Sequence, residues 1–239
     1  MRITVKDTSA GFLKEQQRRG RSIRLAAVAA LTRTAVKVKA AEVETMKRVF
    51  DRPTPFTLNS LQAKPATLQR PEASVETKTG FGSVPAGRFL SPEVEGGTRR
   101  MKSSELQLRT QGSGSYWVPG EFAVLDQYGN IPGSMVNKIL SQIKLRRDSS
   151  QNATSSKASS GKRKNQAFFL KGRIVFLRIR EYFVDADGKR KRDDQTKPYL
   201  FLINAPHYKP ILPFFDVAEQ VTDQNLATEI SKAIDEFDA

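Results

Sequence analysis

The feature that most restricts how this chain folds is a long helix-forming segment that runs into two closely spaced prolines. Alanine is dense from residue 22 to residue 49, and alanine has the highest helix propensity of any residue. Pro53 and Pro55 each lack a backbone N–H and disfavour helical geometry in the preceding residue. Ser22 supplies a side-chain oxygen suited to an N-terminal cap. The sequence therefore predicts a helix from about Ser22 to Val49, followed by a sharp corner.

Apolar residues recur at steps of three and four along this predicted helix, so they lie on one side of it, and many of them have small side chains. The opposite side carries basic residues, among them Lys37, which we expect to be exposed. A face rich in alanine permits close approach of another backbone. Together with the corner it predicts a packing surface between subunits, formed by Leu31, Ala35, Val38, Phe50 and Phe56.

The rest of the chain alternates short extended segments with further helices. Runs of β-branched and aromatic residues, or alternation with period two, predict strands at 73–78, 122–125, 167–171, 173–183 and 198–203. Helical spacing predicts helices at 99–109, from Ser134 onward, and at 214–237. A charged tip at 185–196 joins the last two strands into a hairpin. Ile3 and Val5 add an edge strand.

These elements predict an α+β protein with a single domain spanning residues 1–239. The long N-terminal and C-terminal helices are expected to pack on an antiparallel sheet. The hairpin at 173–203 is expected to extend from the sheet as an arm. Residues 146–166 are an inserted, basic, low-complexity loop with too little apolar surface to fold alone.

Charge is the strongest indication of a partner. The formal net charge of +15 predicts attraction to nucleic acid or to acidic protein surfaces. We expect the basic loop and the hairpin tip to contact DNA or a partner, through Lys144, Arg146, Arg147, Lys157, Lys162, Arg163, Lys164, Lys189, Arg190, Lys191 and Arg192. The alternative for the loop is a disordered connection between two elements.

The C-terminal helix has the opposite charge. Residues 216–239 contain seven acidic side chains and one lysine, a net charge of −6. Such a helix beside a basic body predicts complementary contacts, within one subunit or between neighbours. A solvated helix face is the other interpretation, and both stay open at this point.

Candidates for catalysis are weak. The chain has no cysteine and one histidine, His207, which excludes disulfides, cysteine-based zinc sites and multi-histidine metal sites. Asp185 and Asp187 begin like a calcium loop, but basic residues follow where acceptor oxygens are needed. We expect no enzymatic activity, no metal and no cofactor. No signal-peptide pattern and no run of ~20 apolar residues is present, so we expect no membrane association.

Four parts of the sequence carry a resemblance to a known family. They are residues 30–35 with FDRPTPFT at 50–57, RFL at 88–90 with VEGGTR at 94–99, YGN at 128–130 with ILSQ at 139–142, and NAP at 204–206 with PFFDVAE at 213–219. In this order they resemble tail-completion (neck) proteins of tailed bacteriophages. The named group they resemble is the minor tail protein Z family of lambda-like phages.

The resemblance implies a structural virion protein rather than an enzyme. Such a protein completes the tail and joins it to the head-side connector. It is expected to form a homo-oligomeric ring, with a hexamer favoured, around the DNA channel. Its expected partners are other neck, connector and tail proteins, with non-specific contact to channel DNA. It would be assembled in the bacterial host cytoplasm and lie in the neck or tail of the virion.

Two other functions remain open. One is a stand-alone basic nucleic-acid-binding protein that uses the 146–166 loop and the 187–197 tip as phosphate clamps. The other is an enzyme of the phage packaging or lysis machinery.

Overall fold

The computed structural model describes residues 9–79, 85–109, 116–153 and 166–238. It shows an α+β fold with long helices near both ends of the chain, which confirms the predicted fold class. The chain divides into two compact units, one made of Met1–Glu95 with Pro210–Ala239 and the other of Gly96–Lys209. A single domain was expected. Each unit has its own clusters of buried apolar side chains, and the sequence composition shows no break at either boundary.

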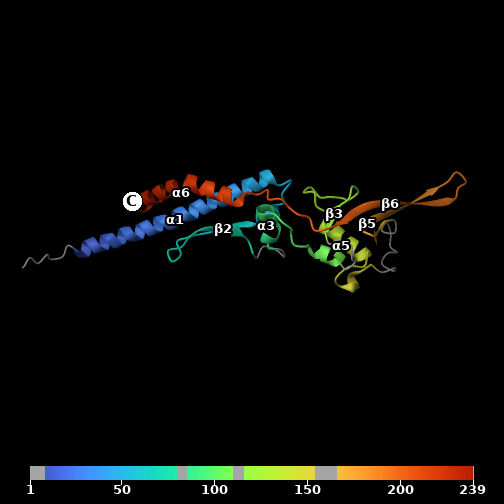
Figure 1. Ribbon diagram of the computed structural model, residues 1–239, viewed down its shortest axis with the longest axis horizontal. Helices are drawn as coiled ribbons and strands as arrows, with labels where there is room; N and C mark the ends of the chain where they lie inside the picture. The colour runs from blue at the N-terminus through green and yellow to red at the C-terminus, as the bar shows by residue number, and fades with distance from the viewer. Residues whose placement is uncertain (1–8, 80–84, 110–115, 154–165, 239) are drawn as a thin grey trace, which may run out of the picture. The chain divides into compact units, whose positions relative to one another are not determined.

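Unit 1 is built on a pair of antiparallel helices, α1 (Ser9–Val49) and α6 (Phe214–Asp238) (Figure 1). Alanines allow the two helices to approach closely, since Ala26, Ala30 and Ala233 are buried together with Phe237 packed against them. Helix α1 begins at Ser9, so Ser22 lies within the helix and does not cap it. The predicted end at Val49 is confirmed.

The corner after α1 is built by the residues that end the helix. Arg52 adopts a φ of 47°, a left-handed backbone conformation in which the helix cannot continue. The Thr54 side chain then accepts a hydrogen bond from the backbone N–H of Thr57 at 3.1 Å, and Pro55 occupies the first position of the short helix α2 (Pro55–Leu58). Proline is favoured there because the missing N–H has no helical partner anyway.

The remainder of unit 1 packs against the C-terminal half of α1. Strands β1 (Leu61–Lys64) and β2 (Ser74–Thr77) form an antiparallel pair that contacts α1. Helix α3 (Gly87–Glu95) follows, in a region for which the sequence predicted no helix. A cluster of buried apolar side chains joins these elements, and it consists of Met46, Leu61, Leu90 and Leu212.

Unit 2 is a four-stranded antiparallel sheet with strand order β3-β6-β5-β4. The strands are β3 (Tyr116–Pro119), β4 (Gln166–Lys171), β5 (Ile174–Val184) and β6 (Arg190–Ile203). Its helical elements are α4 (Ser103–Leu108), α5 (Gly133–Gln142) and a 3-10 turn at Ser149–Gln151. The strand expected at 122–125 is wrong, because β3 pairs with β6 in its place and Val124 is exposed.

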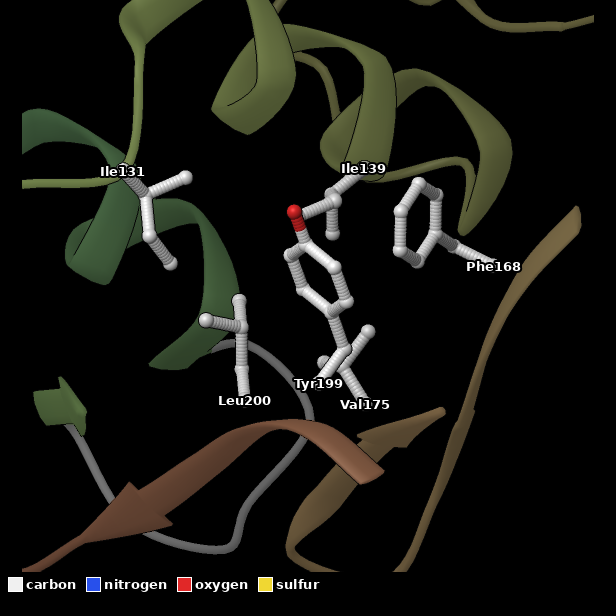
Figure 2. Packing of buried hydrophobic residues seen from close by; sticks show 6 residues of the cluster. All are labelled: Ile131, Ile139, Phe168, Val175, Tyr199 and Leu200. Carbon is white, nitrogen blue, oxygen red and sulfur yellow. The ribbon is translucent and has the colours of Figure 1, made fainter. Parts of the chain in front are cut away.

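The core of unit 2 lies between the sheet and α5. Figure 2 shows Tyr199 beside Phe168, with Ile139 of α5 close to the tyrosine. Tyr199 and Leu200 are adjacent in β6 and yet both are buried, at 1% exposed each. A register shift between Val175 and Phe176 of β5 accounts for this, since a bulge places two consecutive side chains on one face.

The two ends of unit 2 are held together by their own contacts. Gly97 and Tyr208 form an antiparallel bridge with N–H to carbonyl distances of 3.0 and 2.7 Å. Arg99 donates to the Tyr208 hydroxyl at 3.1 Å and pairs with the fully buried carboxylate of Glu105 at 2.5 Å. The pKa of Arg99 is raised, with the hydrogen bond to Glu105 as the main cause.

Candidate interaction surfaces

The two long strands of unit 2 continue as an arm beyond the rest of their sheet. Strand β4 pairs with β5 only as far as Ile179, whereas β5 and β6 stay paired out to Val184 and Arg190 (Figure 1). We call residues 180–194 the arm. This confirms the predicted hairpin, although its turn is shorter than expected because β6 already begins at Arg190.

The end of the arm carries exposed apolar side chains. Tyr182, Phe183 and Val184 are 46%, 51% and 66% exposed. Three consecutive large apolar residues in a strand place side chains on both faces of the ribbon. Exposed apolar surface of this kind marks sites of protein association.

Asp185 builds the turn at the end of the arm. Its Oδ1 atom accepts hydrogen bonds from the backbone N–H groups of Asp187 and Lys189, and its Oδ2 atom lies 2.9 Å from Nζ of Lys191. These contacts lower the pKa of Asp185, with the Lys191 hydrogen bond as the largest cause. Both oxygens of the Asp185 carboxylate therefore already have partners within the turn.

The positively charged side chains of the arm mostly contact acidic or aromatic side chains of the same arm. Lys191 pairs with Asp185, Arg192 pairs with Asp194 at 3.2 Å, and the Arg190 guanidinium lies 4.7 Å from the Tyr182 ring centre. Residues 181–194 contain four basic and five acidic side chains. Part of the positive charge of Lys189, Arg190, Lys191 and Arg192 is therefore balanced within the arm, and their expected contact with DNA or a partner stays a prediction.

A second surface lies on the face of the sheet opposite the core. Phe176, Arg178, Arg180 and Tyr182 alternate with the buried positions of β5, so they share this face. Phe169 of β4 stacks on Phe176 at 5.5 Å, and the Arg178 guanidinium lies 5.8 Å from the Phe169 ring centre. We call these five residues the arginine–aromatic face.

The arginines of this face have unused donors. The Nε atoms of Arg178 and Arg180 are buried and make no hydrogen bond within the described residues. Arg180 approaches Asp194 only to 3.7 Å. Arginine guanidinium groups bind carboxylate and phosphate oxygens, although these two buried Nε atoms are not accessible to a partner in this conformation. This face was not predicted from the sequence, although aromatic and arginine side chains alternate there with period two.

The basic loop divides into described and undescribed parts. Lys157, Lys162, Arg163 and Lys164 lie outside the described residues. Arg146 is held by its neighbours, since its Nε donates to Gln151 at 3.0 Å and its guanidinium also donates to Asn137.

Lys144 and Arg147, which flank Arg146 in this basic segment, have different positions in the structure. Lys144 has a φ of 62° in the turn that ends α5, where the N–H of Leu145 reaches back to the carbonyl of Leu140 at 2.8 Å. Lys144 and Arg147 are both exposed, so among the described residues of the basic segment their side chains can reach a partner.

The expected subunit-packing residues are mostly used within the chain itself. Ala35 and Val38 are 7% and 5% exposed, so they are not available to another subunit. Leu31 and Phe50 are half-buried, and Phe50 packs on the cluster around Met46. Phe56 is 38% exposed, with its ring 5.6 Å from that of Phe89. The close contact predicted for the alanine-rich face is made by α6 of the same chain.

Complementary charge is also used within unit 1. Lys37 donates to Glu229 at 2.8 Å and to Asn225 at 2.9 Å, and Arg33 pairs with Glu236 at 2.6 Å. Lys37 was expected to be exposed but is half-buried, because α6 lies along its side of α1. Part of the acidic charge of α6 is therefore balanced inside the subunit.

Comparison with known protein families, curated proteins and solved structures finds no match to this chain. No cluster of three or more potential metal ligands occurs among the residues that the structure describes. Within the same residues, no helix combines the length and apolar character needed to cross a bilayer.

Proposed function

We propose that the protein is a structural component of the neck or tail of a tailed-phage virion. It completes the tail and joins it to the head-side connector as one subunit of a homo-oligomeric ring around the DNA channel. Its partners are copies of itself and other neck, connector and tail proteins. The observation that carries this proposal is the arm, with Tyr182, Phe183 and Val184 exposed at its end.

The chemistry of the arm favours a protein partner over DNA. Aromatic side chains that become buried in a partner contribute strongly to binding at protein interfaces. The near balance of charge in residues 181–194 removes the general attraction to phosphate that a basic arm would have. Strands at the edge of such a ribbon also offer backbone groups to a neighbouring strand. The sequence resemblance supports the same class of function.

The experiment is incorporation into virions. Tyr182→Ser combined with Phe183→Ser is expected to leave the fold intact and to reduce incorporation into purified particles at least tenfold. Val124→Ser is the matched control, because Val124 is 61% exposed in the same unit but lies off the arm. Normal incorporation of the arm variant, or absence of the wild-type protein from particles, would contradict the proposal.

A second candidate, nucleic-acid binding by the isolated protein, is favoured by the arginine–aromatic face. Stacking of bases on aromatic rings combined with arginine–phosphate contacts binds single strands without sequence preference. Replacement of Arg178 and Arg180 by glutamine would then weaken binding of a fluorescent oligonucleotide and flatten its dependence on salt. Unchanged binding by this variant would exclude the face as a nucleic-acid site.

A further inference from the structure

The charges of the arm are divided between its two faces. Side chains alternate between the faces along each strand, and residues directly opposite each other in an antiparallel pair share a face. The outer face of the arm continues the arginine–aromatic face and consists of Arg180, Tyr182, Val184, Arg190, Arg192 and Asp194. The inner face of the arm continues the side that packs on the core and consists of Glu181, Phe183, Asp185, Lys191 and Asp193. Three arginines and one aspartate give the outer face a charge of +2, and three carboxylates and one lysine give the inner face a charge of −2.

Two acidic side chains of the inner face have no cation beside them. Glu181 and Asp193 lie directly opposite each other in the pairing of β5 with β6, and both are exposed. Neither forms an ion pair within the described part of the chain, and Lys191 of the same face pairs with Asp185 at 2.9 Å. Like charges directly opposite each other destabilise a strand pair. A positively charged surface laid on the inner face would remove this repulsion.

The outer face has the complementary excess of positive charge. Arg180 and Arg192 share one carboxylate, since their Nε atoms lie 3.7 and 3.2 Å from the same oxygen of Asp194. The two arginine side chains are 32% and 55% exposed. Each guanidinium group has five N–H donors, so one shared carboxylate leaves donors for another acceptor.

We propose that the inner face of the arm in one copy of the chain stacks on the outer face of the arm in a second copy, with both arms pointing the same way. Residues of the inner face then lie between successive residues of the neighbour's outer face, because the two sets alternate along each strand. Glu181 is placed beside Arg180 of the neighbour. On the other strand, Asp193 is placed beside Arg192. The inference rests on the proposed function and deepens it, because it names the partner of the arm.

The apolar side chains fit the same arrangement. Phe183 lies on β5 between the positions of Tyr182 and Val184, so in the stack it contacts these two residues of the neighbour. All three are large and exposed in the single chain, and stacking removes them from water. Lys191 meets no carboxylate of the neighbour, but Asp185 of its own chain already balances its charge.

The geometry of this contact leads to a ring. The two stacked faces differ, so each copy joins one neighbour through its inner face and another through its outer face, and such head-to-tail contacts close into rings when the rotation permits. An arm about 17 Å long covers less area than the ~1,600 Å² of a standard interface, so one contact alone is weak and a closed assembly strengthens it. A second arm is favoured over DNA, because DNA on the outer face would leave the carboxylates of the inner face opposed.

Charge reversal tests the stacking. The inner-face variant carries Glu181→Lys and Asp193→Lys, and the outer-face variant carries Arg180→Glu and Arg192→Glu. In either variant like charges meet between copies, so the protein concentration at which half of the chains are assembled is expected to rise by about tenfold or more. The variant with all four substitutions restores opposite charges and is expected to return to within about threefold of the wild type. Sedimentation over a concentration series measures these values.

Reversals of equal size in unit 1 are the controls. Glu219→Lys with Asp223→Lys matches the inner-face variant, and Arg21→Glu with Arg24→Glu matches the outer-face variant, since all four side chains are exposed. These controls are expected to assemble like the wild type. Thermal unfolding of every variant shows whether the core of unit 2, which the arm leaves behind, is still folded.

The outcomes separate this inference from the proposed function. A wild-type protein that stays monomeric at every concentration, assembly unchanged by either reversal, or a folded four-substitution variant that fails to recover would overturn the stacking. Loss of oligonucleotide binding by the outer-face variant with no change in assembly would assign the outer face to nucleic acid instead. Assembly that follows the charges, in a protein that is absent from virions, would contradict the proposed function and leave the stacking intact.

Discussion

Glu42 is a buried carboxyl group whose oxygens accept no hydrogen bond from the described residues. It is 0% exposed, and neither of its oxygens has a hydrogen-bond partner among the described residues. Desolvation raises the pKa of Glu42 from 4.5 to about 7. Between these values the folded chain holds a proton that the unfolded chain has released, so stability falls as pH rises through this window.

Replacing Glu42 by glutamine should remove this dependence. The variant is expected to exceed the wild type in free energy of unfolding by on the order of 3 kcal/mol at pH 8, and to match it near pH 4. Urea unfolding at several pH values measures the difference. Glu44→Gln is the control, since Glu44 is exposed. Parallel curves for the wild type and the Glu42 variant would show that Glu42 is not the neutral buried acid described above.

Lys37 is expected to contribute to the stability of the folded chain, although α1 carries many other basic residues. Its ammonium group is the main cause of the lowered pKa of Glu229, whose side chain is only 7% exposed. This stabilisation is present above the ordinary carboxyl pKa and is lost as pH falls through the lowered pKa. Lys37→Gln is therefore expected to lower the urea midpoint at pH 7 and to have little effect at pH 3. Lys47→Gln, whose partner Glu44 is exposed, should change neither midpoint.

At the scale of elements, the edge of the unit 2 sheet depends on one glycine. The N–H of Gly120 bonds to the carbonyl of Tyr199 at 2.8 Å, and a Cβ atom at this position would lie 2.8 Å from the carbonyl oxygen of Pro198. Gly120→Ala must push back the bulged backbone of β6 and is expected to cost about 1–3 kcal/mol. Gly133→Ala is the matched control, because nothing lies within 4 Å of its Cβ position. Equal melting temperatures for the two variants would contradict the close contact.

The elements with strong local signals were predictable from the sequence. The end of α1, the hairpin of β5 and β6, and α6 follow from prolines, β-branched residues and helical spacing. Helix α3 was missed because Gly87 begins it and Pro92 lies inside it, and both residues normally indicate loops. Residues 122–125 have strand composition but no partner strand, and pairing partners are not visible in a local pattern.

The candidate surfaces were predictable only in part. The sequence located the arm but not which acidic side chains pair with its basic ones: Asp185 meets Lys191 across the turn, and Asp194 lies two residues along the same strand as Arg192. It likewise assigned Ala35 and Val38 to another subunit, since a packing face does not reveal which chain covers it.

At the scale of the whole molecule, the division into two units predicts that unit 2 folds alone. Its hydrophobic clusters draw only on residues within 96–209, and its ends meet in the bridge between Gly97 and Tyr208. A domain with its own core and adjacent ends tolerates excision. A fragment of residues 96–209 is expected to show cooperative thermal unfolding and dispersed amide resonances. A fragment without a cooperative transition would mean that unit 2 needs unit 1 in order to fold.

The pairing of α1 with α6 also has a consequence for the order of events during synthesis. The ribosome must produce all of unit 2 after α1 and before α6, so Ala26 and Ala30 stay uncovered until α6 emerges. Contacts between such distant parts of a chain form late in folding. A chain that stops before residue 214 leaves Ala26 and Ala30 of α1 exposed, so unit 1 closes only after α6 has been translated.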